Sequence, residues 1–304
     1  MLSTMRLVSY SRLGVPSIGV ETESGILDIP EAASRFGRKY NVGGLGFPAT
    51  MKHLLRWESG IEVVQQIVES FENTTPTERP MVYEESETKL EAPISRPGKV
   101  VALGLNYRGH IEETGREIPD FPVIFCKFSS SIVGPDTSIL HPKVTKKLDW
   151  EVELGIVIGK VCRDVAKKDA LNYVAGYTVI NDLSARDLQR GDVQFIRGKS
   201  LDGLCPMGPC IVTTDELGDA SGLELRTKVN GVIKQQSNTS DLLRDVPTIV
   251  SYLSEYFTLE PGDVIASGTP SGVGAARDPP EFLKPGDEVE LFIEKIGYLR
   301  NKIV

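Results

Sequence analysis

Residues 148–158 read LDWEVELGIVI, an apolar strand pattern interrupted by two glutamates. Alternate residues of a strand point to the same face, which predicts one apolar face made of Trp150, Val152, Leu154, Ile156 and Ile158. Glu151 and Glu153 share the other face, roughly 6–7 Å apart along the chain. Two unpaired carboxylates side by side in a core would be costly or would force protonation. At these two positions the strand therefore faces either solvent or a cation.

A second strand pattern downstream favours the cation. VAGYTVIND (174–182) is almost entirely apolar and then gives way to a polar cluster that includes Asn181, Asp182, Ser184, Arg186 and Asp187. If Asp182 joins the two glutamates, three carboxylates leave about three octahedral positions for water and substrate, which suits Mg²⁺ or Mn²⁺. The alternative is a half-exposed strand with an ordinary polar outer face.

Composition limits the classes of partner. The chain has 304 residues, of which 40% are apolar and 25% charged. No run of eighteen apolar residues or secretory leader pattern is visible, so we expect a globular cytoplasmic protein with no membrane partner. The net charge of −8 comes from 34 basic and 42 acidic side chains, without a long basic run, which argues against nucleic acid. The cysteine spacing does not indicate a disulfide framework.

The order of patterns along the chain predicts a small domain followed by a larger one. Residues 5–29 indicate two or three short strands, 51–71 a helix, and 73–98 a polar, proline-bearing connector. We therefore expect a small α+β domain at 1–75, a connector at 76–96 and the main domain at 97–304. Strand-like runs dominate after Lys99, with helices expected at 167–173 and 241–256. This pattern predicts an α+β, mainly β fold.

Six motifs in the second part of the chain resemble the fumarylacetoacetate hydrolase superfamily, in the order that the family shows. They are GLNYRGHIEE (104–113), DWEVELGIVIG (149–159), NDLSARDLQ (181–189), GKSLDGLCPMGP (198–209), KVNG (228–231) and LEPGDVIASGTPSGVG (259–274). The resemblance covers about residues 96–304 and is nearest to small bacterial-type members. Residues 1–75 resemble more loosely the small domain that many members carry.

The resemblance implies a mixed β-sandwich roll, usually a homodimer, with Mg²⁺ or Mn²⁺ bound by Glu151, Glu153 and Asp182. Such an ion would explain two glutamates in a core-like strand, because it neutralises them. Animal fumarylacetoacetases add a fourth acidic ligand before the histidine that corresponds to His110. This chain has Leu103 thereabouts and no acid between Val100 and His110, so we expect three ligands.

The resemblance also suggests the groups that move protons. His110 would be the general base, and Glu113 would orient its imidazole. In related small members this pair lies on a lid that orders over the bound substrate, so the pair is expected to be incomplete without one. Lys199 would place a cation beside the substrate carboxylate or the developing oxyanion. Without the family, an ordinary surface ion pair and a solvated lysine would be the simpler interpretations.

Four further positions match substrate-facing positions of the family. They are Lys127, Arg186, Gln189 and Thr269. His53 and His141 match nothing and are expected to be structural or surface residues.

The expected activity is hydrolysis of a C–C bond in a 2,4-dioxo acid such as an acylpyruvate, through a metal-bound enolpyruvate. The same electron sink serves oxaloacetate decarboxylation, and the stretch SLDGLCPMGP (200–209) looks close to bacterial members described as oxaloacetate decarboxylases. Enol–keto isomerisation and lyase chemistry on a 2-oxo acid are further alternatives. A metal-dependent binding protein without significant turnover is the alternative from another class.

Overall fold

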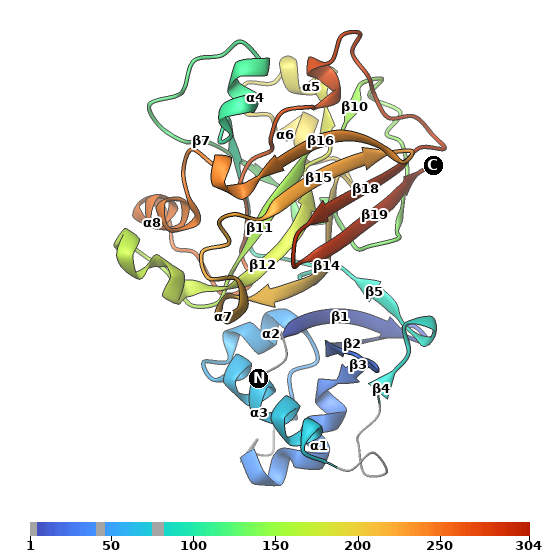
Figure 1. Cartoon of the computed structure of the whole chain (residues 1–304), viewed down its shortest axis with the longest axis vertical. Coiled ribbons are helices and arrows are strands. Elements are labelled where there is room, and N and C mark those ends of the chain that lie inside the picture. The colour runs from blue at the N-terminus through green and yellow to red at the C-terminus, as the bar shows by residue number, and fades with distance from the viewer. Residues whose placement is uncertain (1–4, 41–45, 75–81) are drawn as a thin grey trace.

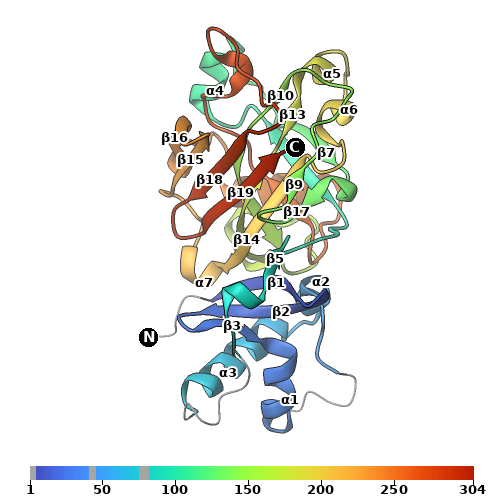
Figure 2. The ribbon, with the colours of Figure 1, turned by 90° about the vertical axis from the view of Figure 1, so that its right-hand side faces the viewer.

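A computed structural model describes residues 5–40, 46–74 and 82–304 and shows two parts, a small N-terminal one and a larger β-rich one (Figures 1 and 2). The boundary expected between residues 75 and 76 lies outside the described residues. Within the described ranges, no helix is both long and apolar enough to cross a bilayer.

The N-terminal part is a small sheet with three helices against it. The strands expected within residues 5–29 are β1 (Arg6–Arg12), β2 (Val15–Thr22) and β3 (Gly25–Asp28). The helices are α1 (Ile29–Tyr40), α2 (Met51–Arg56) and α3 (Gly60–Glu72). The stretch expected to be helical over 51–71 is helical but is divided into α2 and α3. The chain turns sharply between α2 and α3, where a Cβ at Gly60 would lie 2.2 Å from the Leu54 carbonyl oxygen.

The segment expected to be a connector contains sheet structure. β4 (Val82–Tyr83) pairs with β3, and β5 (Lys89–Glu91) pairs with β1. A short 3₁₀ helix, Glu85–Glu87, lies between them. The described part of the segment thus returns to the N-terminal sheet before the chain enters the larger part.

Twelve strands form one sheet that runs through both parts. The larger part contributes β6 (Val100–Gly104), β7 (Val123–Lys127), β8 (Ile132–Val133), β11 (Val152–Ile158), β12 (Val174–Asn181), β14 (Cys205–Thr213) and β17 (Val264–Ala266). The strand order is β4-β3-β2-β1-β14-β12-β11-β17-β6-β7. Antiparallel pairing of β1 with β14 joins the N-terminal strands to the rest.

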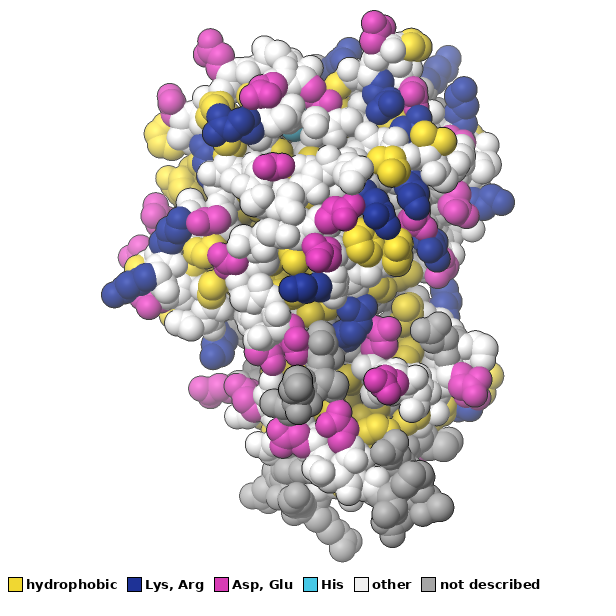
Figure 3. All heavy atoms as spheres, viewed as in Figure 1, with side chains coloured by type: hydrophobic (Ala, Val, Ile, Leu, Met, Phe, Trp, Pro, Cys, Tyr) yellow, Lys and Arg dark blue, Asp and Glu magenta, His cyan; other side chains and the backbone are white. Residues whose placement is uncertain are grey.

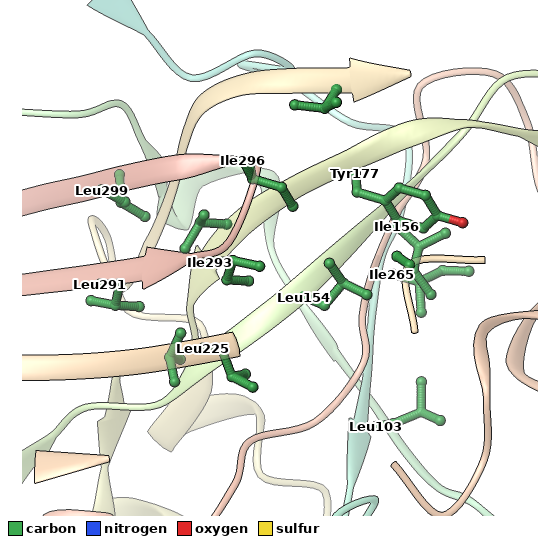
Figure 4. Packing of buried hydrophobic residues seen from close by; sticks show 14 of the residues in the cluster. Leu103, Leu154, Ile156, Tyr177, Leu225, Ile265, Leu291, Ile293, Ile296 and Leu299 are labelled. Carbon is green, nitrogen blue, oxygen red and sulfur yellow. The ribbon is translucent and has the colours of Figure 1, made fainter. Parts of the chain in front are cut away.

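A second sheet packs against the first. Its order is β16-β15-β18-β19-β9, with bounds β9 (Ser138–Ile139), β15 (Glu224–Val229), β16 (Val232–Asn238), β18 (Glu288–Ile293) and β19 (Gly297–Ile303). Figure 4 shows Leu154 of β11 on the side of Leu225 of β15 and Ile293 of β18, while Ile156 lies beside Tyr177 of β12 and Ile265 of β17. This apolar layer between the sheets is the main core. β10 (Leu148–Asp149) and β13 (Ser184–Ala185) form a separate pair.

The central strand β11 is buried on both faces. The five residues expected to share its apolar face all lie in the core between the two sheets. On the other face Val157 joins a second cluster with the N-terminal helices. Glu151 is 4% exposed and Glu153 is 1% exposed. The half-exposed strand is therefore wrong, and the two carboxylates must be compensated inside the protein.

Short helices surround the end of the sheet that carries the polar cluster. They are α4 (Arg108–Glu113), α5 (Arg186–Arg190) and α6 (Ile196–Lys199), while α7 (Thr214–Leu217) and α8 (Val246–Tyr256) lie elsewhere. The helix expected at 167–173 is a 3₁₀ helix with those bounds. The helix expected at 241–256 begins only at Val246, because Asp245 caps it by accepting a hydrogen bond from the Thr248 N–H.

The whole is an α+β, mainly β fold, as expected. Figure 3 shows acidic and basic side chains interspersed over one face of the molecule.

Candidate active site

Three buried carboxylates meet where β11 begins and β12 ends. Val152 is paired with Asn181 across these strands, and the Asp182 N–H donates to the Glu151 carbonyl oxygen over 2.9 Å. This register places Glu151, Glu153 and Asp182 together, with one oxygen of each within 4.8 Å of the others. The strand pairing thus brings the three expected metal ligands to one point.

Two lysines bind this cluster from the side of α6 and β7. Lys199 Nζ donates to Glu151 Oε2 and to Asp182 Oδ2, each over 2.6 Å. Burial lowers the pKa of Lys199, but the neighbouring Asp182 and Glu151 carboxylates outweigh it and raise the pKa. Lys127 Nζ donates to Asp182 Oδ1 over 2.6 Å and also to the carbonyl oxygens of Leu183 and Lys199. Both ammonium groups therefore compensate carboxylate charge.

Arg186, the first residue of α5, is held by two acids. Its Nη2 donates to Glu151 Oε1 over 2.6 Å and its Nε to Asp149 Oδ2 over 2.8 Å. Although burial raises the pKa of Glu151, Arg186 and Lys199 together lower it below its ordinary value. Arg186 Nη1 also donates to Gln189 Oε1 over 3.0 Å, so this guanidinium is a fixed part of the site.

Glu153 is the carboxylate that still needs a cation. It accepts a hydrogen bond from the Gly268 N–H over 2.8 Å, and no ion pair to it is found among the described residues. Burial and the negative charges of Asp182 and Glu151 raise its pKa well above the ordinary range. A divalent cation beside the three carboxylates would reverse this repulsion, and hard carboxylate oxygens are the donors that Mg²⁺ and Mn²⁺ prefer. The residues present therefore fit such an ion.

His110 and Glu113 form a hydrogen-bonded pair. Both residues lie on α4, and His110 Nδ1 is 2.7 Å from Glu113 Oε1. The other oxygen, Oε2, accepts the Gly272 N–H over 2.8 Å. The ordering of this segment over a bound substrate stays a prediction; here the bond to Gly272 ties α4 to the 268–274 loop, and Ile111 of the same helix is buried. With Nδ1 engaged, Nε2 is left to exchange a proton.

A cavity of about 350 Å³ contains these groups. Its volume is at the small end of the range of about 300–1,000 Å³ that is usual for small-molecule sites. Of the expected site residues, it is lined by His110, Glu113, Glu151, Glu153, Arg186, Gln189, Lys199 and Thr269. Apolar side chains, among them Phe125, Phe195 and Val273, complete its wall.

Two expected site residues lie behind this lining. Asp182 is fully buried and does not line the cavity. Burial is compatible with its role as a metal ligand, because an ion needs to reach the carboxylate from one side only. Lys127 is also buried and is held by Asp182 and two carbonyl oxygens, outside the residues that line the cavity. This placement favours support of Asp182 over direct contact with a substrate.

Two important residues carry no sequence signal that pointed to them. Asp149 accepts hydrogen bonds from Arg186 and from the N–H groups of Trp150, Gly274 and Ala275. Gln235 on β16 accepts from the Val152 N–H over 3.0 Å and donates to Thr269 Oγ1 over 2.9 Å. They tie the carboxylate strand to the 268–276 loop. The only hint of Asp149 was its place inside the DWEVELGIVIG motif.

The fold and the carboxylate centre in its cavity indicate an enzyme. The family described as "Fumarylacetoacetate (FAA) hydrolase C-terminal" matches residues 99–304. The chain therefore belongs to the fumarylacetoacetate hydrolase family and is an enzyme of it, as the resemblance implied.

Three relatives show how the family is represented near this chain. It is 40% identical to "Oxaloacetate tautomerase Fahd2a, mitochondrial" of Rattus norvegicus, over 99% of this chain and 92% of that protein. It resembles the structure of a fumarylacetoacetate hydrolase from Exiguobacterium antarcticum, with TM-score 0.80, 38% identity and 99% coverage of both chains. It also resembles a maleylpyruvate hydrolase from Sphingobium in complex with manganese(II) and pyruvate, with TM-score 0.77, 29% identity and 99% coverage of both chains.

Proposed function

We propose that this enzyme interconverts the enol and keto forms of oxaloacetate with the help of Mg²⁺ or Mn²⁺. One observation carries the proposal: a histidine–glutamate pair and a buried triad of carboxylates line or underlie the same small cavity. Tautomerisation needs a group that moves a proton at C3 and a centre that tolerates negative charge on the 2-oxo oxygen. The similarity to the rat oxaloacetate tautomerase, which extends over nearly the whole chain, supports this substrate.

Glu151, Glu153 and Asp182 would hold the divalent ion. When bound, such an ion acts as a Lewis acid that polarises a carbonyl oxygen. The manganese in the Sphingobium hydrolase supports this type of cofactor, and the donor set suits Mg²⁺ equally. Arg186 and Lys199 donate hydrogen bonds to Glu151 and so fix the orientation of this ligand.

His110 would carry the proton between C3 and solvent or the 2-oxo oxygen. Glu113 accepts the Nδ1–H of His110, which leaves the Nε2 lone pair to remove a proton from C3 of the keto form. The same imidazole returns a proton to C3 in the reverse direction, so no water is consumed: a C–H bond is exchanged for an O–H bond while the double bond moves between C2–O and C2–C3. The Gly272 N–H holds Glu113 in place during both steps.

A direct test follows the enol of oxaloacetate by its ultraviolet absorbance in the presence of Mg²⁺ or Mn²⁺. We expect wild-type enzyme to accelerate its conversion to the keto form, and His110→Ala to lose about 100- to 10,000-fold of that acceleration. His53→Ala is the matched control, because His53 lies exposed on α2 in the N-terminal part. No acceleration by the wild type would refute the proposal.

Hydrolysis of an acylpyruvate is the second candidate, favoured by the similarity to the maleylpyruvate hydrolase. The sequence alone placed it first. His110 would then activate water for attack at C4, and the same electron sink would stabilise the enolpyruvate that leaves. Release of acetate and pyruvate from acetylpyruvate, lost in His110→Ala, would establish hydrolysis. Release of pyruvate and CO₂ from oxaloacetate, at the rate at which the enol disappears, would establish decarboxylation instead.

A further inference from the structure

Two arginines in the cavity wall have no partner in the described part of the chain. The basic side chains that line the cavity are His110, Arg116, Arg186, Arg190 and Lys199. Three of them are committed: His110 to Glu113, and Arg186 and Lys199 to Glu151. For the guanidinium groups of Arg116 and Arg190, the described residues provide neither an ion pair nor a hydrogen bond, and both side chains are exposed.

These two arginines come from different elements. Arg116 lies three residues beyond α4, the helix of His110 and Glu113, and Arg190 is the last residue of α5, the helix that begins with Arg186. Figures 1 and 2 show α4 and α5 as separate helices at the same end of the molecule. Arg116 thus follows the helix that carries His110 and Glu113, and Arg190 ends the helix whose Arg186 positions the carboxylate centre.

We infer that Arg116 and Arg190 bind the second carboxylate of a dicarboxylate 2-oxo acid and so determine substrate class. The inference rests on the proposed function, in which the C1 carboxylate and 2-oxo oxygen of the substrate lie toward the buried carboxylate centre. The C4 carboxylate of a four-carbon substrate then points outward. The exposed guanidinium groups are the cations still available to it, because the inner ones are neutralised by Glu151 and Asp149.

The chemistry of the two residues fits this role. A guanidinium presents its N–H donors in a planar fork that matches a carboxylate, and it stays charged at all relevant pH values. Because both side chains are exposed, water solvates their charges and they need no internal partner. A monocarboxylate of the same length would leave the two positive charges uncompensated at the mouth of the cavity.

The test compares oxaloacetate with 2-oxobutanoate, in which a methyl group replaces the C4 carboxylate. Exchange of the C3 hydrogens for deuterium, followed by NMR in D₂O with Mg²⁺, reports enolisation of both. In Arg116→Gln, Arg190→Gln and the double variant, we expect KM for oxaloacetate to rise about 10- to 100-fold, as for loss of a charge-assisted hydrogen bond. The kcat for oxaloacetate and both constants for 2-oxobutanoate should change much less, and Arg→Lys variants should recover part of the loss.

Arg56→Gln is the matched control, since Arg56 is an exposed arginine at the end of α2 and does not line the cavity. A double variant that keeps the wild-type preference for oxaloacetate would overturn the inference. If wild-type enzyme exchanges the hydrogens of neither acid, the proposed function fails, and calorimetry then tests the arginines separately. Tighter binding of oxaloacetate than of 2-oxobutanoate, lost in the double variant, would support the subsite, whereas equal affinities would overturn it.

Discussion

Replacing Asp149 by asparagine should destabilise the protein strongly, although the two side chains have nearly the same size. Asp149 is fully buried and accepts four hydrogen bonds, of 2.8 Å from Trp150 N–H, 2.6 Å from Gly274 N–H, 2.9 Å from Ala275 N–H and 2.8 Å from Arg186 Nε. The asparagine amide nitrogen cannot accept, so donors on one side would face another donor. The substitution also leaves the buried Arg186 with Glu151 as its remaining anion.

The cost follows from these contacts. Removing one partner of a buried ion pair costs about 3–5 kcal/mol, and each buried donor left unsatisfied costs about 1–3 kcal/mol. Because the effects share one site they do not add fully, and we expect the free energy of unfolding to fall by about 3–5 kcal/mol. Urea denaturation of Asp149→Asn beside wild type measures this difference. Asp202→Asn, at an exposed carboxylate that has no hydrogen-bond or ion-pair partner among the described residues, is the control.

A loss below about 1 kcal/mol, the level of an ordinary surface change, would refute the argument that Asp149 organises the site. A loss of the expected size with normal activity in the folded fraction would also be informative. It would show that Arg186 holds Glu151 without help from Asp149. We expect instead that activity falls as well, because the loop carrying Gly274 and Ala275 lines the same cavity as His110.

Three further predictions follow from other contacts. Glu153→Gln should weaken Mn²⁺ binding, measured by calorimetry, at least about tenfold. The same substitution should raise the melting temperature of the metal-free protein, because it removes a buried charge that Glu151 and Asp182 repel. A lower melting temperature would contradict this account. Burial raises the pKa of the Cys205 and Cys210 thiols from 9.0 to about 12, so between these values the folded state keeps protons that the unfolded state releases. The stability that these thiols contribute should therefore be full below pH 9 and fall as the pH rises from 9 to 12. Urea midpoints across that range measure the fall, which should be shallower in Cys210→Ala. Gly272→Ala should lower kcat and the melting temperature together. The φ of Gly272 is +100° and a Cβ there would lie 2.2 Å from the Lys234 carbonyl oxygen, so the backbone would shift and move the N–H that holds Glu113. Unchanged kinetics would show that this hydrogen bond is dispensable.

The sequence predicted the centre of the site better than its surroundings. The alternation of β11 followed from a strict two-residue period, and the polar end of β12 located Asp182, because both signals are local. Apart from the two-residue β8, the strands of the first sheet were recognised from Val100 onward, whereas β16, β18 and β19 of the second sheet were not singled out. Their alternation with exposed polar residues resembles that of many surface segments.

The residues that sequence reasoning missed act across long separations. Gln235 reaches Val152 from 83 positions away, and Asp149 reaches Gly274 from 125. A single glutamine or aspartate has no periodic signature, and its importance comes from being buried with its hydrogen bonds satisfied by distant backbone groups. Arg116 and Arg190 were missed for the opposite reason. Exposed arginines are common, and only the three-dimensional structure shows that these two line the cavity without a partner among the described residues.

The pairing of β1 with β14 has a consequence for how the molecule can be taken apart. The family match begins at residue 99, which invites expression of the larger part by itself. Yet the backbone of β14 at Ile211 and Val212 is covered by Leu7 and Arg6. Cutting the chain before residue 97 would expose the β14 edge at Ile211 and Val212 beside an uncovered apolar surface, the arrangement from which strand-to-strand aggregation starts. The small N-terminal part thus protects the sheet that carries the active site from such pairing.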